Sequence, residues 1–186
     1  MKKIIISFIA IIVLGVSSQA SDTTLNNPFP KEPYKEMDRI NVLIGQLETD
    51  QIYCLAQNIY FESRSDNLAG QIAVTDVVLN RRNSLSYPDT VCDVLYQGKQ
   101  DSRGNMIRNQ CQFSWYCDGK SDNIPNPNTN DAWQLALDLA TDMYYNNNWV
   151  GITEGSTHYH ATYVKPAWAY KFTLVGRIGK HIFYRH

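Results

Sequence analysis

Apolar residues recur at helical spacing in the stretch that leads to Glu62. Ile52, Leu55 and Ile59 follow one another at steps of three and four residues, which predicts a helix with one buried face. The next position on this face, three residues further on, is Glu62. The pattern therefore places a carboxyl group on the core side of a helix, near the point where that helix ends.

A carboxylate in this position is unfavourable for two reasons. Desolvation raises the pKa of the group, and the negative end of the helix dipole raises it further. A glutamate that stays protonated near neutral pH has the property that a general acid requires. Periodicity alone leaves a second interpretation open, in which Glu62 turns outward or pairs with Arg64.

The hydrophobic pattern predicts two more long helices and one short one. The first, residues 68–80, is apolar around most of its circumference and is expected to be the central buried helix. Asp66 and Asn67 can cap its start. A short helix is expected from Pro88 through Leu95, and a third long helix after an Asn130 cap. The stripe of this last helix is Trp133, Ala136, Leu137, Ala140 and Tyr144.

The last third of the chain changes to the alternation of strands. Residues 157–163 alternate, and residues 172–175 can pair with residues 181–184 across a glycine-flanked turn. Residues 98–130 are polar, with Gly, Asn and Pro throughout, and are expected to form a long loop. The pattern predicts a mainly helical α+β fold, one compact domain with a small C-terminal β-hairpin region.

The beginning of the chain has the pattern of an export signal. Two lysines precede an apolar run over residues 4–16, and Ser18-Gln19-Ala20 supplies the small residues of a cleavage site. The run is shorter than the ~20 residues of a spanning helix. We therefore predict a signal peptide over 1–20, no stable membrane insertion after cleavage, and a periplasmic or secreted protein. Residues 21–46, with three prolines among polar residues, are expected to be a linker into a domain over 47–186.

Cysteine usage and charge limit the partners further. An even number of cysteines in an exported chain predicts two disulfides among Cys54, Cys92, Cys111 and Cys117. Pairing Cys111 with Cys117 is the local option, although the sequence leaves three connectivities open. A zinc site is less favoured, because the chain has no close Cys-x-x-Cys pair. The formal net charge is −1, so no broad basic field predicts a nucleic acid partner.

Five segments carry motifs that occur in a fixed order. They are residues 54–65, 70–81, 87–92, 111–119 and 179–184. Together they resemble the cell-wall hydrolase family typified by spore cortex-lytic enzymes, over roughly residues 50 to 185. Two departures lie beside Glu62, since Ser63 and the pair Ser65-Asp66 stand where the family usually has Ala and Gly-Glu.

The resemblance implies an enzyme with a lysozyme-like fold, whose catalytic Glu lies near the end of a core helix. The spacing of the apolar residues also places Glu62 near the end of a core helix. The implied reaction is cleavage of peptidoglycan glycan strands between N-acetylmuramic acid and N-acetylglucosamine, as in a lytic transglycosylase that yields 1,6-anhydro-muropeptides. Glu62 would act as general acid, with no second carboxylate, no metal and no cofactor. Peptidoglycan is the expected partner, and a monomer the expected state.

Aromatic and polar residues in two of these segments are expected to line the substrate cleft. The resemblance favours saccharide contacts by Gln112, Phe113, Ser114 and Trp115, and cleft positions for Tyr159 and His160. The alternative for the first group is a hydrophobic cluster held under the loop by a disulfide.

Other functions remain open at this point. Asp66, Asp76 or Asp118 could serve a hydrolytic muramidase as a second acid. A zinc-dependent N-acetylmuramoyl-L-alanine amidase would use His158, His160 and His181 as ligands. A non-catalytic wall-binding module would use the aromatic residues without requiring a buried Glu.

Overall fold

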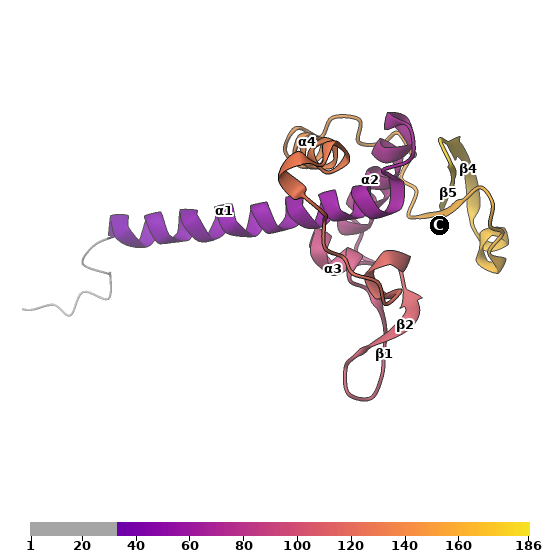
Figure 1. The fold of residues 1–186 in the computed structure, drawn as a ribbon, viewed down its shortest axis with the longest axis horizontal. Coiled ribbons are helices and arrows are strands. Elements are labelled where there is room, and N and C mark those ends of the chain that lie inside the picture. The colour runs from indigo at the N-terminus through magenta and orange to yellow at the C-terminus, as the bar shows by residue number, and fades with distance from the viewer. Residues whose placement is uncertain (1–32) are drawn as a thin grey trace, which may run out of the picture.

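A computed structural model describes residues 33–186 (Figure 1). The predicted signal peptide and the first part of the predicted linker lie outside these residues. Residues 33–46, which we expected to belong to the linker, are helical and form the first part of α1, Pro33–Asn58. Proline fits the first turn of a helix because its missing N–H has no partner there. This part of α1 extends away from the rest of the fold in Figure 1.

The central helix is α2, Leu68–Arg82, as the hydrophobic pattern predicts. Its start is capped by Asn67, whose side chain accepts a hydrogen bond from the Gly70 N–H at 2.9 Å. The starts of two further helices are capped in the same way. Thr90 caps α3, Val91–Leu95, and Asn130 caps α4, Asp131–Asn146. The Asn67 and Asn130 caps and the three helices are confirmed, although α3 begins at Val91 and not at Pro88. Helix α4 buries Leu139 and Met143 in addition to the predicted Trp133, Ala136 and Ala140.

The segment expected to be one long loop contains a β-hairpin. Strand β1, Gly98–Gln100, pairs antiparallel with β2, Met106–Cys111. The Asp101 carboxylate fixes the turn by accepting hydrogen bonds from the Arg103 and Asn105 N–H groups at 2.8 and 2.9 Å. Two short 3-10 helices follow, η2 at Ser114–Cys117 and η3 at Pro127–Thr129.

The C-terminal part forms a three-stranded antiparallel sheet in the order β3-β5-β4. The strands are β3 His158–Ala161, β4 Thr173–Ile178 and β5 His181–Arg185, and the 3-10 helix η4, Ala167–Lys171, lies between β3 and β4. This confirms the predicted strands. The sheet packs on α2 through a small cluster of Phe183 with Ala73, Val74 and Val77.

The turn between β4 and β5 lies against the corner that follows Glu62. Gly179 has a φ of +57°, and a Cβ there would lie 2.5 Å from the Asp66 carboxylate. The same carboxylate accepts a hydrogen bond from the Lys180 N–H at 2.8 Å. Glycine is therefore required at the turn, both for its backbone conformation and for this close approach.

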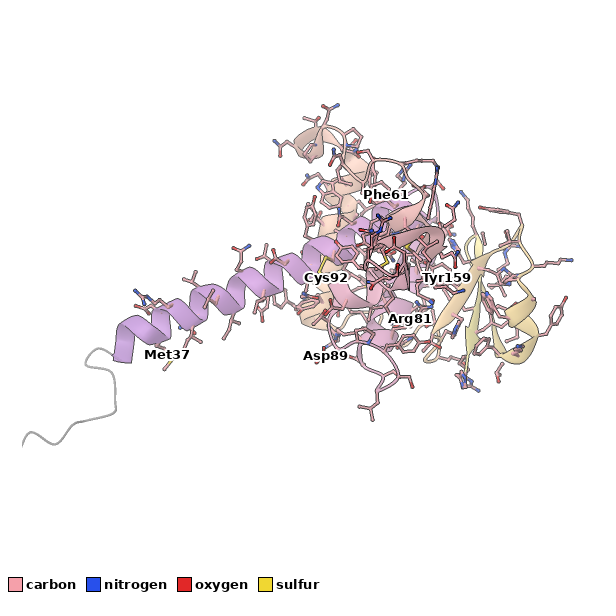
Figure 2. The ribbon with its side chains drawn as sticks, turned by 90° about the horizontal axis from the view of Figure 1, so that it is seen from below. Met37, Phe61, Arg81, Asp89, Cys92 and Tyr159 are labelled. Carbon is pink, nitrogen blue, oxygen red and sulfur yellow. A yellow bond between two sulfur atoms is a disulfide. The ribbon has the colours of Figure 1, made fainter. Side chains whose placement is uncertain are left out.

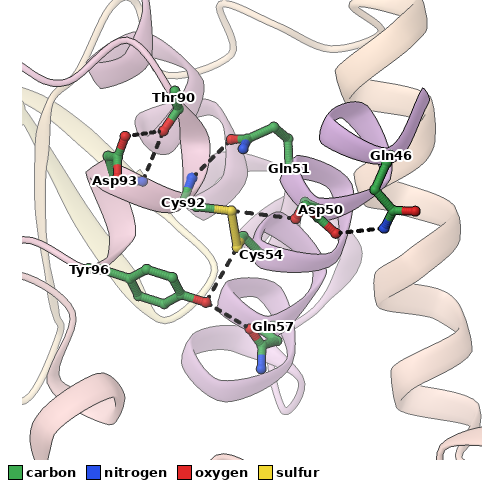
Figure 3. The surroundings of a disulfide bond; sticks show 9 residues. All are labelled: Gln46, Asp50, Gln51, Cys54, Gln57, Thr90, Cys92, Asp93 and Tyr96. Atoms are coloured by element: carbon green, nitrogen blue, oxygen red, sulfur yellow. Dashed lines mark hydrogen bonds between the residues drawn. A yellow bond between two sulfur atoms is a disulfide. The ribbon is translucent and has the colours of Figure 1, made fainter. Parts of the chain in front are cut away.

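Two disulfides, Cys54–Cys92 and Cys111–Cys117, hold the elements around the core. The pairing agrees with the local option, and none of the four cysteines is free. Figure 3 shows how the first disulfide joins α1 to α3, where Gln51 also accepts a hydrogen bond from the Cys92 N–H at 3.1 Å. The second closes the loop that carries η2.

A buried carboxylate connects α2 to the segment that leads into β3. Asp76 is fully buried and accepts hydrogen bonds from the Gly151 N–H at 2.7 Å and from the Thr153 N–H at 3.0 Å. The Thr153 hydroxyl donates to it as well, at 2.5 Å. Because β3 follows directly, these bonds fix where that strand begins on α2.

Candidate active site

Glu62 lies in a single π-helical turn, η1 Ile59–Ser63, which directly continues α1. Single π-helical turns inside helices are frequent at functional sites. Here the Ser63 hydroxyl donates to the Ile59 carbonyl at 3.0 Å, and both residues are buried. The turn changes the direction of the side chains at the end of α1, so that Glu62 faces a cavity between the helices and the sheet.

This cavity has a volume of about 470 Å³. Glu62 and five of the six predicted substrate-binding residues line it: Gln112, Phe113, Ser114, Tyr159 and His160. Phe61, Arg81, Ala161, Tyr163, Val164 and His181 complete the lining. Figure 2 shows Phe61, Arg81 and Tyr159 in the region where the helices meet the sheet.

Burial raises the pKa of Glu62 from 4.5 to about 7. The Tyr159 hydroxyl and the Ser114 backbone N–H act in the opposite direction and lower the pKa, because both favour the carboxylate. The side chain stays partly exposed, since it opens onto the cavity. A half-protonated carboxyl group at neutral pH, open to a cavity, can donate a proton to a bound molecule.

Arg64 does not hold Glu62 on the surface. Its guanidinium donates to the Tyr60 carbonyl at 2.9 Å and lies 4.6 Å from the centre of the Tyr60 ring. Arg64 is exposed, whereas Glu62 lies in the cavity. The interpretation of Glu62 as an outward, ion-paired residue is therefore wrong.

Trp115 corrects the predicted substrate contacts. Its side chain is buried in the main core and stacks on Phe61, with ring centres 5.2 Å apart. The indole N–H donates to Asn58 Oδ1 at 3.1 Å. Trp115 is not among the residues that line the cavity, so for this residue the alternative of a cluster under the loop is the better description.

Arg81 is a cavity residue that the sequence analysis did not single out. It is only 5% exposed, and its Nε donates to the Thr157 carbonyl at 2.7 Å. The guanidinium lies 5.2 Å from the ring centres of both Tyr87 and Phe113. Burial lowers the pKa of Arg81. The signal that the sequence offered was a charged residue near the end of the helix that was expected to be the central buried one.

The three histidines of the alternative zinc site have separate partners. His158 stacks on Phe172 with ring centres 4.1 Å apart, and burial lowers its pKa to about 4. His160 Nε2 lies 3.0 Å from the Tyr184 hydroxyl, and His181 Nδ1 lies 3.3 Å from the Asp66 carboxylate. Within residues 33–186, no three His, Cys, Asp or Glu side chains gather closely enough to hold a metal ion.

The three aspartates considered as second acids do not line the cavity, although Asp66 contacts the lining residue His181. Asp66 accepts from the Lys180 N–H and Asp76 from the Gly151 N–H. Asp118 is paired with Lys120 at 3.3 Å on the surface. Among the described residues, Glu62 is the one carboxyl group that lines the cavity.

Two further hollows adjoin the cavity. One, of about 440 Å³, lies at the β1–β2 hairpin and shares Gln112 with it. The other, of about 380 Å³, lies beside η4 and shares His160 and Val164. The cavity therefore continues into two neighbouring hollows through different lining residues, an arrangement that suits an extended ligand better than a small molecule.

Comparison with known proteins identifies the family. The sequence model of the family described as cell wall hydrolase matches residues 65–184. The chain belongs to the cell wall hydrolase family. The match to this family of enzymes begins three residues after Glu62 and does not include that residue.

Several spore cortex-lytic enzymes are similar to this cell wall hydrolase. The enzyme from Bacillus subtilis (strain 168) is 28% identical over 139 residues, which are 75% of this chain and 39% of the relative. The enzyme from Halalkalibacterium halodurans is 30% identical over 144 residues, 77% of this chain and 37% of the relative. The chain thus spans well under half the length of these two relatives.

Two solved structures share the fold. The catalytic domain of the germination-specific lytic transglycosylase SleB from Bacillus anthracis aligns with a TM-score of 0.53 and 28% identity, covering 73% of this chain and 93% of that domain. The catalytic domain of the Bacillus cereus SleB protein aligns with the same TM-score and identity, covering 74% and 91%. The cell wall hydrolase therefore has the α+β fold of a SleB catalytic domain, as expected.

Within residues 33–186, no helix combines the length and the apolar character needed to cross a membrane.

Proposed function

We propose that this protein cleaves the glycan strands of peptidoglycan between N-acetylmuramic acid and N-acetylglucosamine, as a lytic transglycosylase. One observation carries the proposal: Glu62, with a pKa of about 7, is the one carboxyl group among the described residues of the cavity. A glycosidase that uses water requires a second carboxylate at ~5–10 Å from the first. A transglycosylase does not, because a hydroxyl of the substrate takes the place of water.

The reaction proceeds in two steps on one residue. Protonated Glu62 gives its proton to the glycosidic oxygen while the bond from that oxygen to muramic acid C1 breaks. The 6-hydroxyl oxygen of the same muramic acid then bonds to C1, and its proton passes to the Glu62 carboxylate. The products are a free N-acetylglucosamine end and a 1,6-anhydro ring, and Glu62 is protonated again.

The surroundings of the cavity support a glycan substrate. The amide of Gln112 and the hydroxyl groups of Ser114 and Tyr163 can bond to sugar hydroxyls, while aromatic rings can pack on the faces of sugars. The adjoining hollows give room for residues of the strand on both sides of the cleaved bond. Peptidoglycan lies outside the cytoplasm, where the two disulfides are stable.

Digestion of purified sacculi, followed by mass analysis of the soluble fragments, tests the proposal. We expect muropeptides that end in 1,6-anhydro-muramic acid, with and without EDTA. Fragments with reducing muramic acid ends would indicate a hydrolytic muramidase instead. Free stem peptides, lost on chelation and restored by zinc, would indicate the amidase, and binding without soluble fragments would indicate a wall-binding module.

A further inference from the structure

The surroundings of Asn58 fix the orientation of its side-chain amide. Asn58 is fully buried and lies at the start of the π-helical turn, four residues before Glu62. Because the indole N–H of Trp115 can only donate, the atom that it meets at 3.1 Å must be the amide oxygen. The amide nitrogen Nδ2 therefore points to the other side, as a donor.

Asn58 Nδ2 and the Tyr159 hydroxyl are two of four buried side-chain atoms that have no partner at full hydrogen-bonding geometry among the described residues. Leaving a buried polar atom unpaired is unfavourable, because the atom has lost its hydrogen bonds to water. Tyr159 and Glu62 nevertheless line the same cavity, and the Tyr159 hydroxyl lies close enough to Asn58 and to Glu62 for each to change the pKa of the phenol. A small closing movement would satisfy both atoms, and hydrogen bonds of this kind often tighten only when substrate is bound.

The hydrogen-bonding capacities of these side chains fix the direction of the hydrogen bonds between them. Asn58 Nδ2 has only protons to offer, so it uses a lone pair of the Tyr159 oxygen. The other charged neighbour, Arg81, can likewise only donate, so the hydroxyl proton of Tyr159 is free for the Glu62 carboxyl group. The Tyr159 ring is held in place by its neighbours on the sheet, His181 and Phe183, with ring centres 5.2 and 5.8 Å away.

We propose that Tyr159 is a positioning residue that donates a hydrogen bond to the Glu62 carboxyl group, and that Trp115 and Asn58 set the direction of this bond. The inference rests on the proposed function and adds a role that differs from the substrate contact predicted for Tyr159. No proton leaves Tyr159 in this role. Its hydroxyl stabilises the Glu62 carboxylate between the two steps and keeps the carboxyl group directed at the glycosidic oxygen.

The test is the titration of Glu62 in the wild type and in Tyr159→Phe, followed through the ¹³C signals of labelled carboxyl groups. Loss of the donor should move the titration of Glu62 upward by about one pH unit, since a hydrogen bond to a charged group is worth roughly that much. The high-pH limb of kcat/KM should move by the same amount, and kcat should fall on the order of tenfold. Tyr145→Phe, which removes an exposed phenol hydroxyl on α4, should change neither.

A purely structural role for Tyr159 makes a different prediction. Activity could fall through poorer packing, but the titration of Glu62 would stay where it is in the wild type. That result in a folded Tyr159→Phe protein overturns the inference. The variant keeps the ring that packs on Phe183 and is expected to fold; Asn58→Ala, which leaves the phenol undirected, provides a second test with a smaller upward movement of the titration.

The titration separates this inference from the proposed function. If the wild type releases no glycan fragments but the titration moves in Tyr159→Phe, the function fails and the hydrogen bond stands. If fragments are released and the titration does not move, the function stands and the positioning role is wrong.

Discussion

Replacing Glu62 by Gln removes the proton that the proposed reaction requires and little else. The amide keeps the size of the side chain and can still bond to the Tyr159 hydroxyl. With a pKa of about 7, roughly half of wild-type Glu62 is protonated at pH 7, so the wild-type rate should fall about tenfold for each pH unit above that value. Glu62→Gln should lose on the order of 10²–10⁴-fold in turnover at and below pH 7, and the gap to the wild type should narrow above it.

The same substitution should raise the stability of the folded protein at high pH. The folded-state pKa of Glu62 lies above the unfolded value of 4.5, so the folded protein binds the proton more tightly. The resulting stabilisation is complete below pH 4.5 and is lost as the pH rises to about 7. The difference between these two pKa values corresponds to about 2–3 kcal/mol in the free energy of unfolding, after allowance for screening through the open side of the cavity.

The experiment measures turnover on sacculi and melting temperature on one preparation. At pH 8, Tm of Glu62→Gln should exceed that of the wild type by roughly 5–10 °C, and the gap should close at pH 4. Glu154→Gln, at an exposed position between α4 and β3, is the matched control and should follow the wild type in both measurements. Near-normal release of fragments by a well-folded Glu62→Gln protein would refute the mechanism, whereas a lower Tm at pH 8 would refute the burial argument.

Two further predictions concern the support of the site. Asp76→Ala should cost about 3 kcal/mol or more in urea unfolding, because three donors on residues 151–153, two of them buried, lose their acceptor. Asp138→Ala, at an exposed position, is the control, and a cost for Asp76→Ala less than about 1 kcal/mol above that of the control would contradict this role. Removing Cys54–Cys92 should cost about 4 kcal/mol and removing Cys111–Cys117 about 2, from loop lengths alone. Turnover should nevertheless fall further when Cys111–Cys117 is removed than when Cys54–Cys92 is removed, because the Cys111–Cys117 loop places the Ser114 N–H beside Glu62. A larger loss of turnover on removing Cys54–Cys92 would contradict this role of the loop.

The starts of α2 and α4 could be predicted from the sequence because the interactions that define them are local. Asn67, Thr90 and Asn130 each cap a helix with a side chain that bonds to a backbone N–H three residues on. The position of Glu62 on the core side also followed from spacing within one helix. Each of these predictions uses residues within about three helical turns of one another.

The features that the sequence did not reveal depend on contacts between distant segments. Phe113 and Trp115 are both buried in the main core, and only Phe113 also lines the cavity. The sequence could not tell them apart, because Trp115 is turned to the core side by a hydrogen bond to Asn58, 57 residues earlier. The hairpin at residues 98–111 was missed because its strands are mostly polar and exposed, without apolar alternation. Arg81 faces the cavity because of a carbonyl 76 residues away.

The acid strength of Glu62 is likewise a property of the assembled fold and not of its helix. Burial between η1 and the sheet accounts for the rise of its pKa, and without opposing groups the same burial would raise it further. The two groups that lower it come from β3 and from the start of η2, which are separated in sequence from Glu62 by 97 and 52 residues. One is fixed by the sheet and by the Asp76 contacts before it, the other by the Cys111–Cys117 loop. A proton that is available at neutral pH therefore requires all three segments to be in place, which explains why so much of the buried polar structure of this small domain lies around a single carboxyl group.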